Sequence, residues 1–470
     1  MPDLPQYLGL TCLTPVHVGT GTEYVAGVDF IARGNNTYLL DSERVLEKLY
    51  ASGQLPRDPG DLKSKVERMF ERERPEDCAL ARCSGTVGGD LKVRAAIRAG
   101  DGRPIIPGSS LKGALRTLIF VGRVGKDGPH DGMKPSLEIE LSRAAEPPRA
   151  KFAARMIEER LFCSSTAAEL GLGSNDAKAD LLRLCSVSDA YFAPDAAQVV
   201  ITAAVGTTRR NTTVGAEVLT ANAKAAIQFR LGLLYAESMF TEHLPSWDVL
   251  AGWSRRHAMH LLETDLLYFA KPQGEPRRDC AKVIESLEAI KLEIGRAKSD
   301  TMFLRLGWGT GWRTMTGDVQ DASQRKHLLE KSNEFGPKTR KVIIADGAQS
   351  AAAVKVLGWI SLEPISPEAA RELNSKTRPG APRVPVSAAQ LEPIAAASFS
   401  GDQFIQGLSR LRPSDWGRLS NLYAQAEEGK ERRNARLEAL ALKIAEVWGR
   451  DSKRLAEARQ KFSALAPYWK

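Results

Sequence analysis

Apolar residues recur along this chain with two periods, and each period predicts a different kind of element. Alternating or continuous apolar runs predict strands at residues 7–14, 30–31, 37–40, 92–98, 184–192, 198–205, 224–234, 304–306 and 354–362. Apolar residues three and four positions apart predict helices behind Asp41 or Ser42, over much of 56–76, at 151–162 and across 247–295. The chain is therefore expected to combine sheets and helices.

The most informative segment runs from Ile106 to Arg116 and reads Ile-Pro-Gly-Ser-Ser-Leu-Lys-Gly-Ala-Leu-Arg. A Pro-Gly turn precedes an apolar stripe of helical period at Leu111, Ala114, Leu115, Leu118 and Ile119. Ser109 or Ser110 stands where a helix N-cap acceptor is wanted, and Lys112 and Arg116 lie one turn apart beside the helix start. Free amides, the helix dipole and two cations together favour the binding of an anion such as phosphate at the start of this helix. An ordinary capped helix with both cations in solvent explains the pattern equally well.

The same segment has spacings found in other chemistries, but their supporting residues are missing. Ser109-x-x-Lys112 has the spacing of lysine-activated serine acyltransferases, but the chain lacks the Lys-Thr-Gly element of that class. Gly108 and Gly113 are spaced as in a P-loop, but Ala114 follows where the lysine is required. Neither an acyl-enzyme nor a nucleotide-binding P-loop is expected.

Two glycine loops, Gly19-Thr20-Gly21 and Gly307-Trp308-Gly309-Thr310-Gly311, can bring the backbone close to a ligand. Trp308 and Trp312 either stack on nucleic-acid bases or fill the domain core, and the core is the slightly better interpretation. His17 follows the first predicted strand and is a candidate general base for RNA cleavage. A lone histidine more often has a structural role.

Changes in composition mark the expected organisation of the chain. Residues 122–148 are rich in glycine and proline without a sustained period, which predicts an inserted loop within about 121–180. Residues 363–400 hold prolines among alanines and serines, and this composition is typical of a linker. Residues 401–470 return to helical spacing and predict a small, basic, all-helical tail.

Composition narrows the class of protein further. The 470 residues exceed one ordinary domain, and 43% hydrophobic residues suffice for buried cores. A formal net charge of +9 permits a polyanionic partner without requiring one. A signal-peptide pattern and an apolar run of membrane-spanning length are both missing, so a cytoplasmic protein with no membrane partner is expected. The six cysteines lack C-x-x-C pairs and are expected to be buried free thiols, with no metal and no cofactor.

Taken in order, several of these segments resemble the RAMP superfamily of CRISPR proteins. The resemblance is carried by Thr14–Gly21, Val28–Ile31, Ile106–Arg116, Val187–Ala190, Leu306–Gly311 and Leu357–Trp359. Within the superfamily, the chain is most similar to the fifth-subunit family of the type III-A (Csm) effector complex. The similarity extends over about residues 5–362.

The resemblance implies an α+β fold with two ferredoxin-like (RRM-like) domains with insertions, one over residues 1–205 and one over 206–362. It implies a non-catalytic subunit that binds guide RNA (crRNA), with target RNA as a further candidate partner. The other partners that it implies are the backbone and small helical subunits of the complex. The implied role is to cap the 3′ end of the guide RNA and to contribute to guide maturation in antiviral defence. The residues expected on RNA are Ser109, Ser110, Lys112, Arg116, Gly19, Gly21, Gly307, Trp308, Gly309 and Gly311.

Two alternative functions, and three interpretations of the tail, stay open on the sequence alone. In the first alternative the chain is a metal-independent ribonuclease that processes guide RNA with His17 as base. In the second it is a pure protein scaffold. The tail at 401–470 is reminiscent of the small helical subunits of such complexes, but it also fits a docking segment or a nonspecific RNA clamp.

Overall fold

The computed structural model describes residues 4–54, 56, 58–88, 91–124, 158–164, 179–206, 213–231, 244–271, 279–311, 314, 339–345 and 352–377, with positions 422, 423, 437, 440, 441, 443, 444 and 462. The chain divides into two compact units, residues 1–381 and residues 382–470. The elements described below belong to the first unit.

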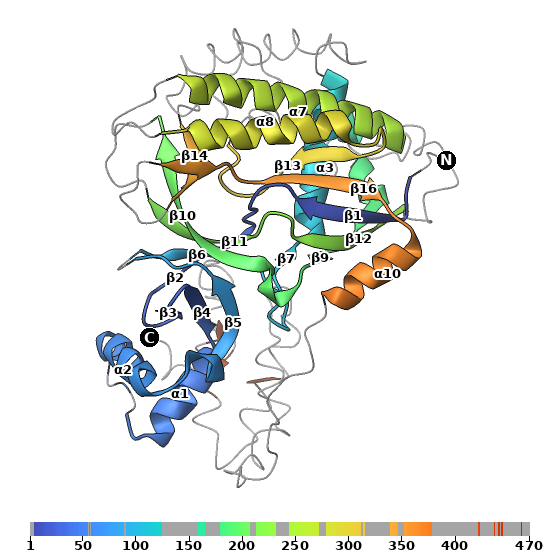
Figure 1. The fold of residues 1–470 in the computed structure, drawn as a ribbon. Coiled ribbons are helices and arrows are strands. Elements are labelled where there is room, and N and C mark those ends of the chain that lie inside the picture. Colours follow the sequence, from blue (N-terminus) through green and yellow to red (C-terminus); the bar gives the residue numbers. More distant parts are fainter. Residues whose placement is uncertain are drawn as a thin grey trace, which may run out of the picture. The chain divides into compact units, whose positions relative to one another are not determined.

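One sheet of the first unit has five antiparallel strands in the order β13-β16-β1-β12-β8 (Figure 1). Its strands are β1 (Tyr7–Cys12), β8 (Cys185–Val187), β12 (Lys224–Leu231), β13 (Met302–Arg305) and β16 (Trp359–Pro364). The first strand of the chain is the central one, because Leu8 pairs with Ile227 on one side and with Pro364 on the other. The two ends of this unit are therefore joined within one sheet.

The second sheet contains nine strands, seven of them in the order β2-β6-β11-β10-β5-β4-β3. These strands are β2 (Gly19–Tyr24), β3 (Phe30–Arg33), β4 (Asn36–Leu40), β5 (Ala79–Ser84), β6 (Val93–Ala96), β10 (Ala197–Val205) and β11 (Val214–Leu219). The other two, β14 (Arg340–Ile344) and β15 (Ala353–Lys355), pair with each other, and β14 also pairs with β10. A short two-stranded sheet joins β7 (Ile105–Ile106) to β9 (Ala190–Tyr191).

Three long helices pack on these sheets through apolar stripes. They are α3 (Gly108–Val124), α7 (Trp247–Ala270) and α8 (Ala281–Arg296), and Figure 1 shows α7 and α8 side by side across one face. The α3 stripe, including Leu111, Leu115 and Leu118, lies in one core with β1 and β12. The α7–α8 pair closes a second core through residues such as Leu262 and Leu287. Burial of these stripes, rather than helix propensity alone, stabilises the helices.

The shorter helices complete the first unit. They are α1 (Ser42–Ala51), α2 (Pro59–Arg72) and α10 (Pro367–Lys376), with 3₁₀ turns at Pro75–Asp77, Leu181–Leu184 and Pro194–Ala196 and a π turn at Arg160–Ser164. Asp41 caps α1 as predicted, because its carboxylate accepts from the Glu43 and Arg44 amides. Arg33 pairs with Asn36, which confirms the predicted hairpin. None of the helices in the described part of the chain is long and apolar enough to cross a membrane.

The structure differs from the sequence predictions at several element boundaries. The strand predicted at 354–362 is split in two, because Gly358 has a φ of +93° that ends β15 before β16 begins. The predicted linker at 363–400 begins with the end of β16 and the helix α10, whose start is capped by Ser366. The insertion predicted from about 121 begins later, since α3 continues to Val124.

The mixture of sheets and helices confirms the α+β class, whereas the two ferredoxin-like domains stay a prediction. Strands from 1–205 and from 206–362 share both large sheets, so the boundary at 205/206 does not separate two independent sheets. In the tail, positions 437, 440, 441 and 444 are helical and buried at the predicted spacing. The six cysteines, all among the described residues, are thiols that form no disulfide, and five of them are buried.

Candidate functional site

The predicted anion site at the start of α3 already holds a carboxylate of this chain. The helix begins at Gly108, whose amide donates to Asp189 Oδ1 at 2.8 Å. The amides of Ser110 and Leu111 donate to the Pro107 carbonyl, so neither serine is the N-cap and that expectation was wrong. A negative group at a helix N-terminus is stabilising, and Asp189 supplies it here. We name this region, residues 106–116 with 187–189, the helix-start cluster.

Glycine is required at the first position of this helix because the backbone of β8 lies against it. A Cβ on Gly108 would lie 2.0 Å from the Val187 carbonyl oxygen, a distance that atoms do not adopt. By contrast, a Cβ on Gly113, one turn further along the helix, would meet nothing within 4 Å. The Pro-Gly pair of the motif is thus explained by close packing of two backbones.

The two cations of the helix-start cluster differ in their surroundings. Arg116 forms ion pairs with Asp180 at 2.6 Å and Glu158 at 3.3 Å, and its guanidinium lies 3.9 Å from the centroid of the Phe162 ring. Lys112 is half-buried. It lies close enough to Cys185 for its positive charge to lower the pKa of that thiol, although burial has the larger effect and raises this pKa to about 11. Arg116 can reach an RNA phosphate only if its pairs open, so its predicted contact stays a prediction.

The second region is formed by three segments that are far apart in sequence. The Gly358 amide donates to the Pro15 carbonyl at 2.9 Å, and the Trp308 amide donates to the His17 carbonyl at 2.8 Å. The Leu306 amide donates to the Gly358 carbonyl at 2.9 Å, which closes the set. We name this region, residues 15–21, 306–311 and 357–359, the glycine junction. The structure therefore brings the two predicted glycine loops together.

Positive φ angles explain the glycines of the junction. Gly307, Gly309 and Gly311 have φ values of +89°, +87° and +90°, in the region that side chains other than glycine rarely adopt. A Cβ on Gly307 would also lie 2.4 Å from the His17 carbonyl oxygen. Gly21 has a φ of +90° and, like Gly311, open space around it. The outer glycines are required by conformation alone, which leaves their surface accessible.

His17 is a structural residue of the junction in this geometry. Its side chain is 2% exposed, and its Nδ1 lies 2.6 Å from the Glu217 carbonyl oxygen, so this nitrogen is the donor. A Cβ on Gly19 would lie 2.5 Å from Nε2, which shows how closely the β2 backbone covers the other nitrogen. Burial lowers the pKa of the His17 imidazole below its usual value, so the ring is neutral at pH 7. A general base needs contact with the proton that it removes, and this imidazole is enclosed.

Trp308 packs on the protein and also contacts two cations. One side of the residue lies against a small apolar cluster that includes Ala216 and Val218, and its ring meets the His17 ring edge-on at 5.5 Å between centroids. Arg94 Cζ and Lys341 Nζ each lie 4.8 Å from the centroid of the Trp308 ring. The packing interpretation of Trp308 is therefore supported, while Trp312 lies outside the described residues.

Sequence reasoning missed Lys341 entirely and recorded Arg94 only as part of a strand. The available signal was the pair Lys92-x-Arg94, two cations on one face of a strand. Nothing local in the sequence shows that β14 brings Lys341 to the same tryptophan, since this depends on the pairing of β14 with β10.

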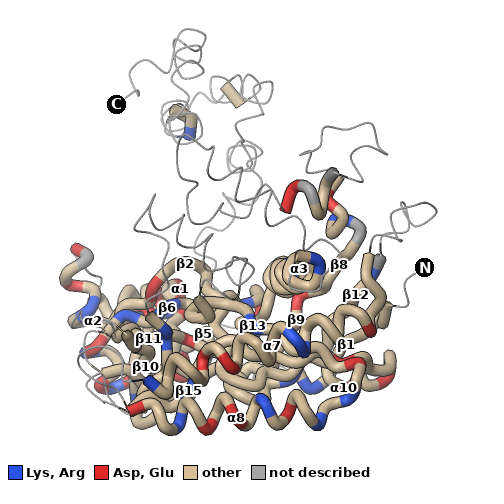
Figure 2. The backbone as a smooth tube through the Cα atoms, turned by 90° about the horizontal axis from the view of Figure 1, so that it is seen from above, with Lys and Arg blue, Asp and Glu red and all other residues tan. Residues whose placement is uncertain are grey.

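The most deeply buried arginines that the structure describes are neutralised by carboxylates. Arg98 contacts Glu217 Oε1 at 2.5 Å, and burial raises the pKa of the Glu217 carboxyl although Arg98 opposes the shift. Arg305 and Arg340 share Asp265, at 2.6 Å and 2.7 Å. Figure 2 shows basic and acidic positions interspersed along α8 as well. Net charge thus says little here, and local pairing decides which cations can bind an anion.

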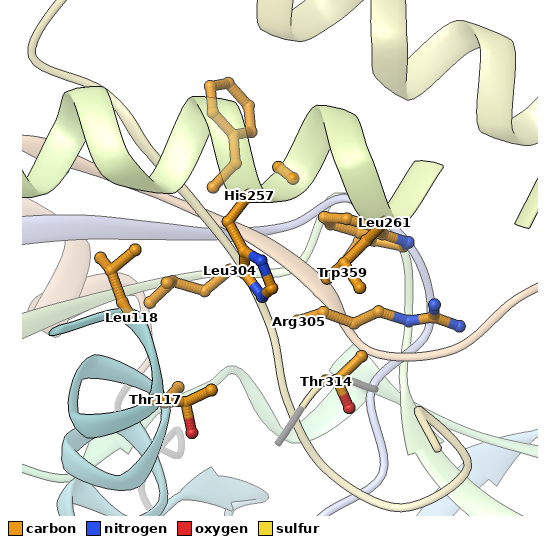
Figure 3. A pocket seen from close by; sticks show the side chains of 11 residues that line it. Thr117, Leu118, His257, Leu261, Leu304, Arg305, Thr314 and Trp359 are labelled. Atoms are coloured by element: carbon orange, nitrogen blue, oxygen red, sulfur yellow. The ribbon is translucent and has the colours of Figure 1, made fainter. Parts of the chain in front are cut away.

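A small pocket lies between α3, α7 and β13 (Figure 3). Thr117, His257, Arg305 and Trp359 line it among apolar side chains. The Arg305 guanidinium is already bound to Asp265, so the pocket offers no uncompensated charge from that residue. Among the residues that the structure covers, no group of three or more potential metal ligands comes together.

Comparison with known proteins matches one family model and a number of chains in solved structures, two of which illustrate the similarity. The model of the RAMP superfamily matches residues 9–314. A chain of the cryo-EM structure of a Csm–crRNA–target RNA ternary complex from a type III-A CRISPR–Cas system is similar, with a TM-score of 0.53 and 19% identity over 77% of this chain and 100% of that chain. The crystal structure of T. onnurineus Csm5 has a TM-score of 0.49 and 19% identity over 75% of this chain and 99% of that chain. No curated protein matches the sequence.

Proposed function

This chain belongs to the RAMP superfamily, and we propose that it is a non-catalytic RNA-binding subunit of a type III-A CRISPR effector complex. In this proposal it binds guide RNA, contacts backbone and small helical subunits in the cytoplasm, and caps the 3′ end of the guide. The observation that carries the proposal is the glycine junction, where three family segments meet and present positive-φ glycines beside the cations Arg94 and Lys341.

The fold supports the same proposal. The similar chain in the Csm–crRNA–target RNA complex is covered over its whole length. At 19% identity this likeness concerns the fold alone. That this chain also binds a guide RNA and sister subunits is part of our proposal. The glycine loops and the exposed Ser109 are the surfaces that we place on RNA, with Ser110 and Lys112 beside it.

The position of His17 supports the absence of cleavage activity. A ribonuclease that uses this residue would need Nε2 at the surface, but the ring is enclosed by Gly19, Trp308 and the Glu217 carbonyl. A cleavage assay on repeat RNA tests the alternative directly. Metal-independent cleavage that is lost in His17→Gln would overturn the non-catalytic assignment.

The decisive experiment is purification of the tagged chain from its native cells, followed by identification of the bound proteins and sequencing of the bound RNA. We expect sister effector subunits and a population of guide RNAs with defined 3′ ends. Recovery of the chain without RNA and without such subunits would overturn the proposal.

Capping of the guide is tested in the same complex with a photoreactive uridine at either end of the RNA. We expect crosslinks from the 3′-terminal nucleotides to this chain and few from the 5′-terminal nucleotides. Equal crosslinking at both ends would leave RNA binding in place but reject the 3′ assignment.

The glycine loops are tested by a pair of matched variants. Gly311→Ala and Gly53→Ala both put a side chain at positive φ, +90° and +68°, in open space, but only Gly311 belongs to the junction. Each substitution should cost about 1 kcal/mol or somewhat more in stability. We expect only Gly311→Ala to weaken guide binding.

A further inference from the structure

Arg94 and Lys341 are brought together by two neighbouring parts of the nine-stranded sheet. Arg94 on β6 is paired with Ala216 on β11, and Lys341 on β14 is paired with Ala204 on β10. Arg94 Cζ and Lys341 Nζ each lie 4.8 Å from the centroid of the Trp308 ring, and Trp308 packs against the apolar cluster that includes Ala216. Cation–π contact of this kind fixes the position of a charged group without neutralising it.

The two charges are close enough to repel each other. Since each lies 4.8 Å from one ring centroid, they are separated by no more than twice that distance, which is about the screening length of ~8–10 Å at physiological ionic strength. Burial and the charge of Arg94 lower the pKa of Lys341, and Arg94 also contributes to the lowered pKa of His17. The folded chain thus concentrates positive potential at this point.

Carboxylates of the chain compensate these cations only weakly. Glu23 lies 3.8 Å from Arg94 Nη2 and 3.9 Å from Lys92 Nζ, and its side chain is 37% exposed. Within the described ranges, Lys341 has no carboxylate at ion-pair distance, and Arg94 Nε is buried without a hydrogen-bond partner. Long, exposed ion pairs contribute little, so Glu23 is a weak competitor for an incoming anion.

We infer that Arg94 and Lys341, held against Trp308, form a binding site for a phosphate of the RNA backbone. This inference rests on the proposed function, which supplies the RNA. Phosphate oxygens accept several charge-assisted hydrogen bonds, which suits an arginine donor left unpaired beside an ammonium group. Trp308 serves as the platform that positions the cations, and it is a positioning residue rather than a surface for base stacking.

The test uses the full effector complex and the guide RNA that copurifies with it, resynthesised for binding measurements over a range of salt concentrations. Arg94→Ala and Lys341→Ala should each weaken binding about three- to tenfold and reduce the salt slope by about 0.7, the value for one phosphate contact on single-stranded nucleic acid. Arg371→Ala and Lys291→Ala are the controls, because each removes an ion-paired cation with an exposed side chain, on a helix away from Trp308, α10 or α8. We expect these controls to leave affinity and slope unchanged.

A second measurement separates phosphate contact from an indirect effect on folding. Neutral methylphosphonate groups are placed one at a time along the RNA, and one position should weaken binding to the wild-type complex. The same position should have no further effect in Arg94→Ala or Lys341→Ala, because the contact is already lost. Additive losses, or an unchanged salt slope in both variants, would overturn the inference while leaving the proposed function intact. If the wild-type complex carries no RNA, the proposed function and this inference are both rejected.

Discussion

The helix-start cluster and the glycine junction are assembled in the same way but treat positive charge differently. Each joins short segments that are far apart in sequence through close contact between backbones. In the helix-start cluster, Asp189 occupies the helix N-terminus and Arg116 is bound by two carboxylates. Beside the glycine junction, Arg94 and Lys341 lie against the Trp308 ring, and the carboxylate that the structure describes near Arg94, that of Glu23, is 3.8 Å away and partly exposed. Conspicuous cations in a motif are therefore a weaker guide to an anion site than the carboxylates around them.

The largest effect that we expect tests the structural role of the helix-start cluster. Gly108→Ala should destabilise the chain by about 3 kcal/mol or more, because the new methyl group collides with the rigid Val187 carbonyl. Gly113→Ala in the same helix should be neutral or stabilise it by up to about 1 kcal/mol. Thermal unfolding of the purified chain measures both. Equal stabilities would show that the contact between α3 and β8 is not rigid.

Acid should weaken the glycine junction through His17. The folded-state pKa of His17 is lowered by burial, so the unfolded chain takes up a proton first as the pH falls below about 6.5. Stability contributed by this residue is present above that pH and is lost on acidification, by up to about 2 kcal/mol between pH 6.5 and pH 5. Denaturant unfolding of wild type and His17→Gln should show a shallower pH slope in the variant. Parallel slopes would mean that the ring titrates normally.

Two single variants separate the cations of the helix-start cluster. Arg116→Ala removes two partly exposed ion pairs and the Phe162 contact, and should cost about 1–2 kcal/mol of stability without changing the salt slope of RNA binding. Lys112→Ala should do the reverse, with little loss of stability and a slope lower by about 0.7. A lower slope in Arg116→Ala would show that its ion pairs open to bind RNA and would weaken the contrast drawn above.

The smallest effect that we expect is a gain in RNA affinity, whereas most of the variants above lose stability or affinity. Glu23→Gln removes the carboxylate that faces Arg94 and Lys92, and should tighten RNA binding by about two- to threefold at low salt. Glu368→Gln on α10 changes the formal charge equally, at another exposed ion pair. If both variants tighten binding equally, the effect comes from net charge and not from the Arg94–Lys341 site.

Local patterns in the sequence predicted much of the fold because local chemistry determines those features. Asp41 as a helix cap, the Gly34-Asn35 hairpin and the apolar stripe of α3 are all set by neighbouring residues. The pairing of β1 with β12 and β16 could not be predicted in this way, because it depends on contacts across hundreds of residues.

The candidate site was predictable only in part. The glycine loops were identified because positive φ restricts the residue type, but the point where they meet depends on backbone hydrogen bonds between segments that are far apart in the sequence. The serine caps were predicted wrongly, because the carboxylate at the start of α3 comes from Asp189, which is distant in sequence. Lys341 carried no local signal, since its importance depends on the tryptophan that another loop places beside it.

The central position of β1 has a consequence for the synthesis of this protein. Leu8 leaves the ribosome early, yet its partner Pro364 follows only after more than three quarters of the chain has been made. Until then β1 has one free edge, and contacts of such long range form slowly because the intervening chain must first be ordered. Strand edges that wait for their partners promote aggregation. We therefore expect the nascent chain to depend on chaperones, and truncations before β16 to be insoluble rather than partly active.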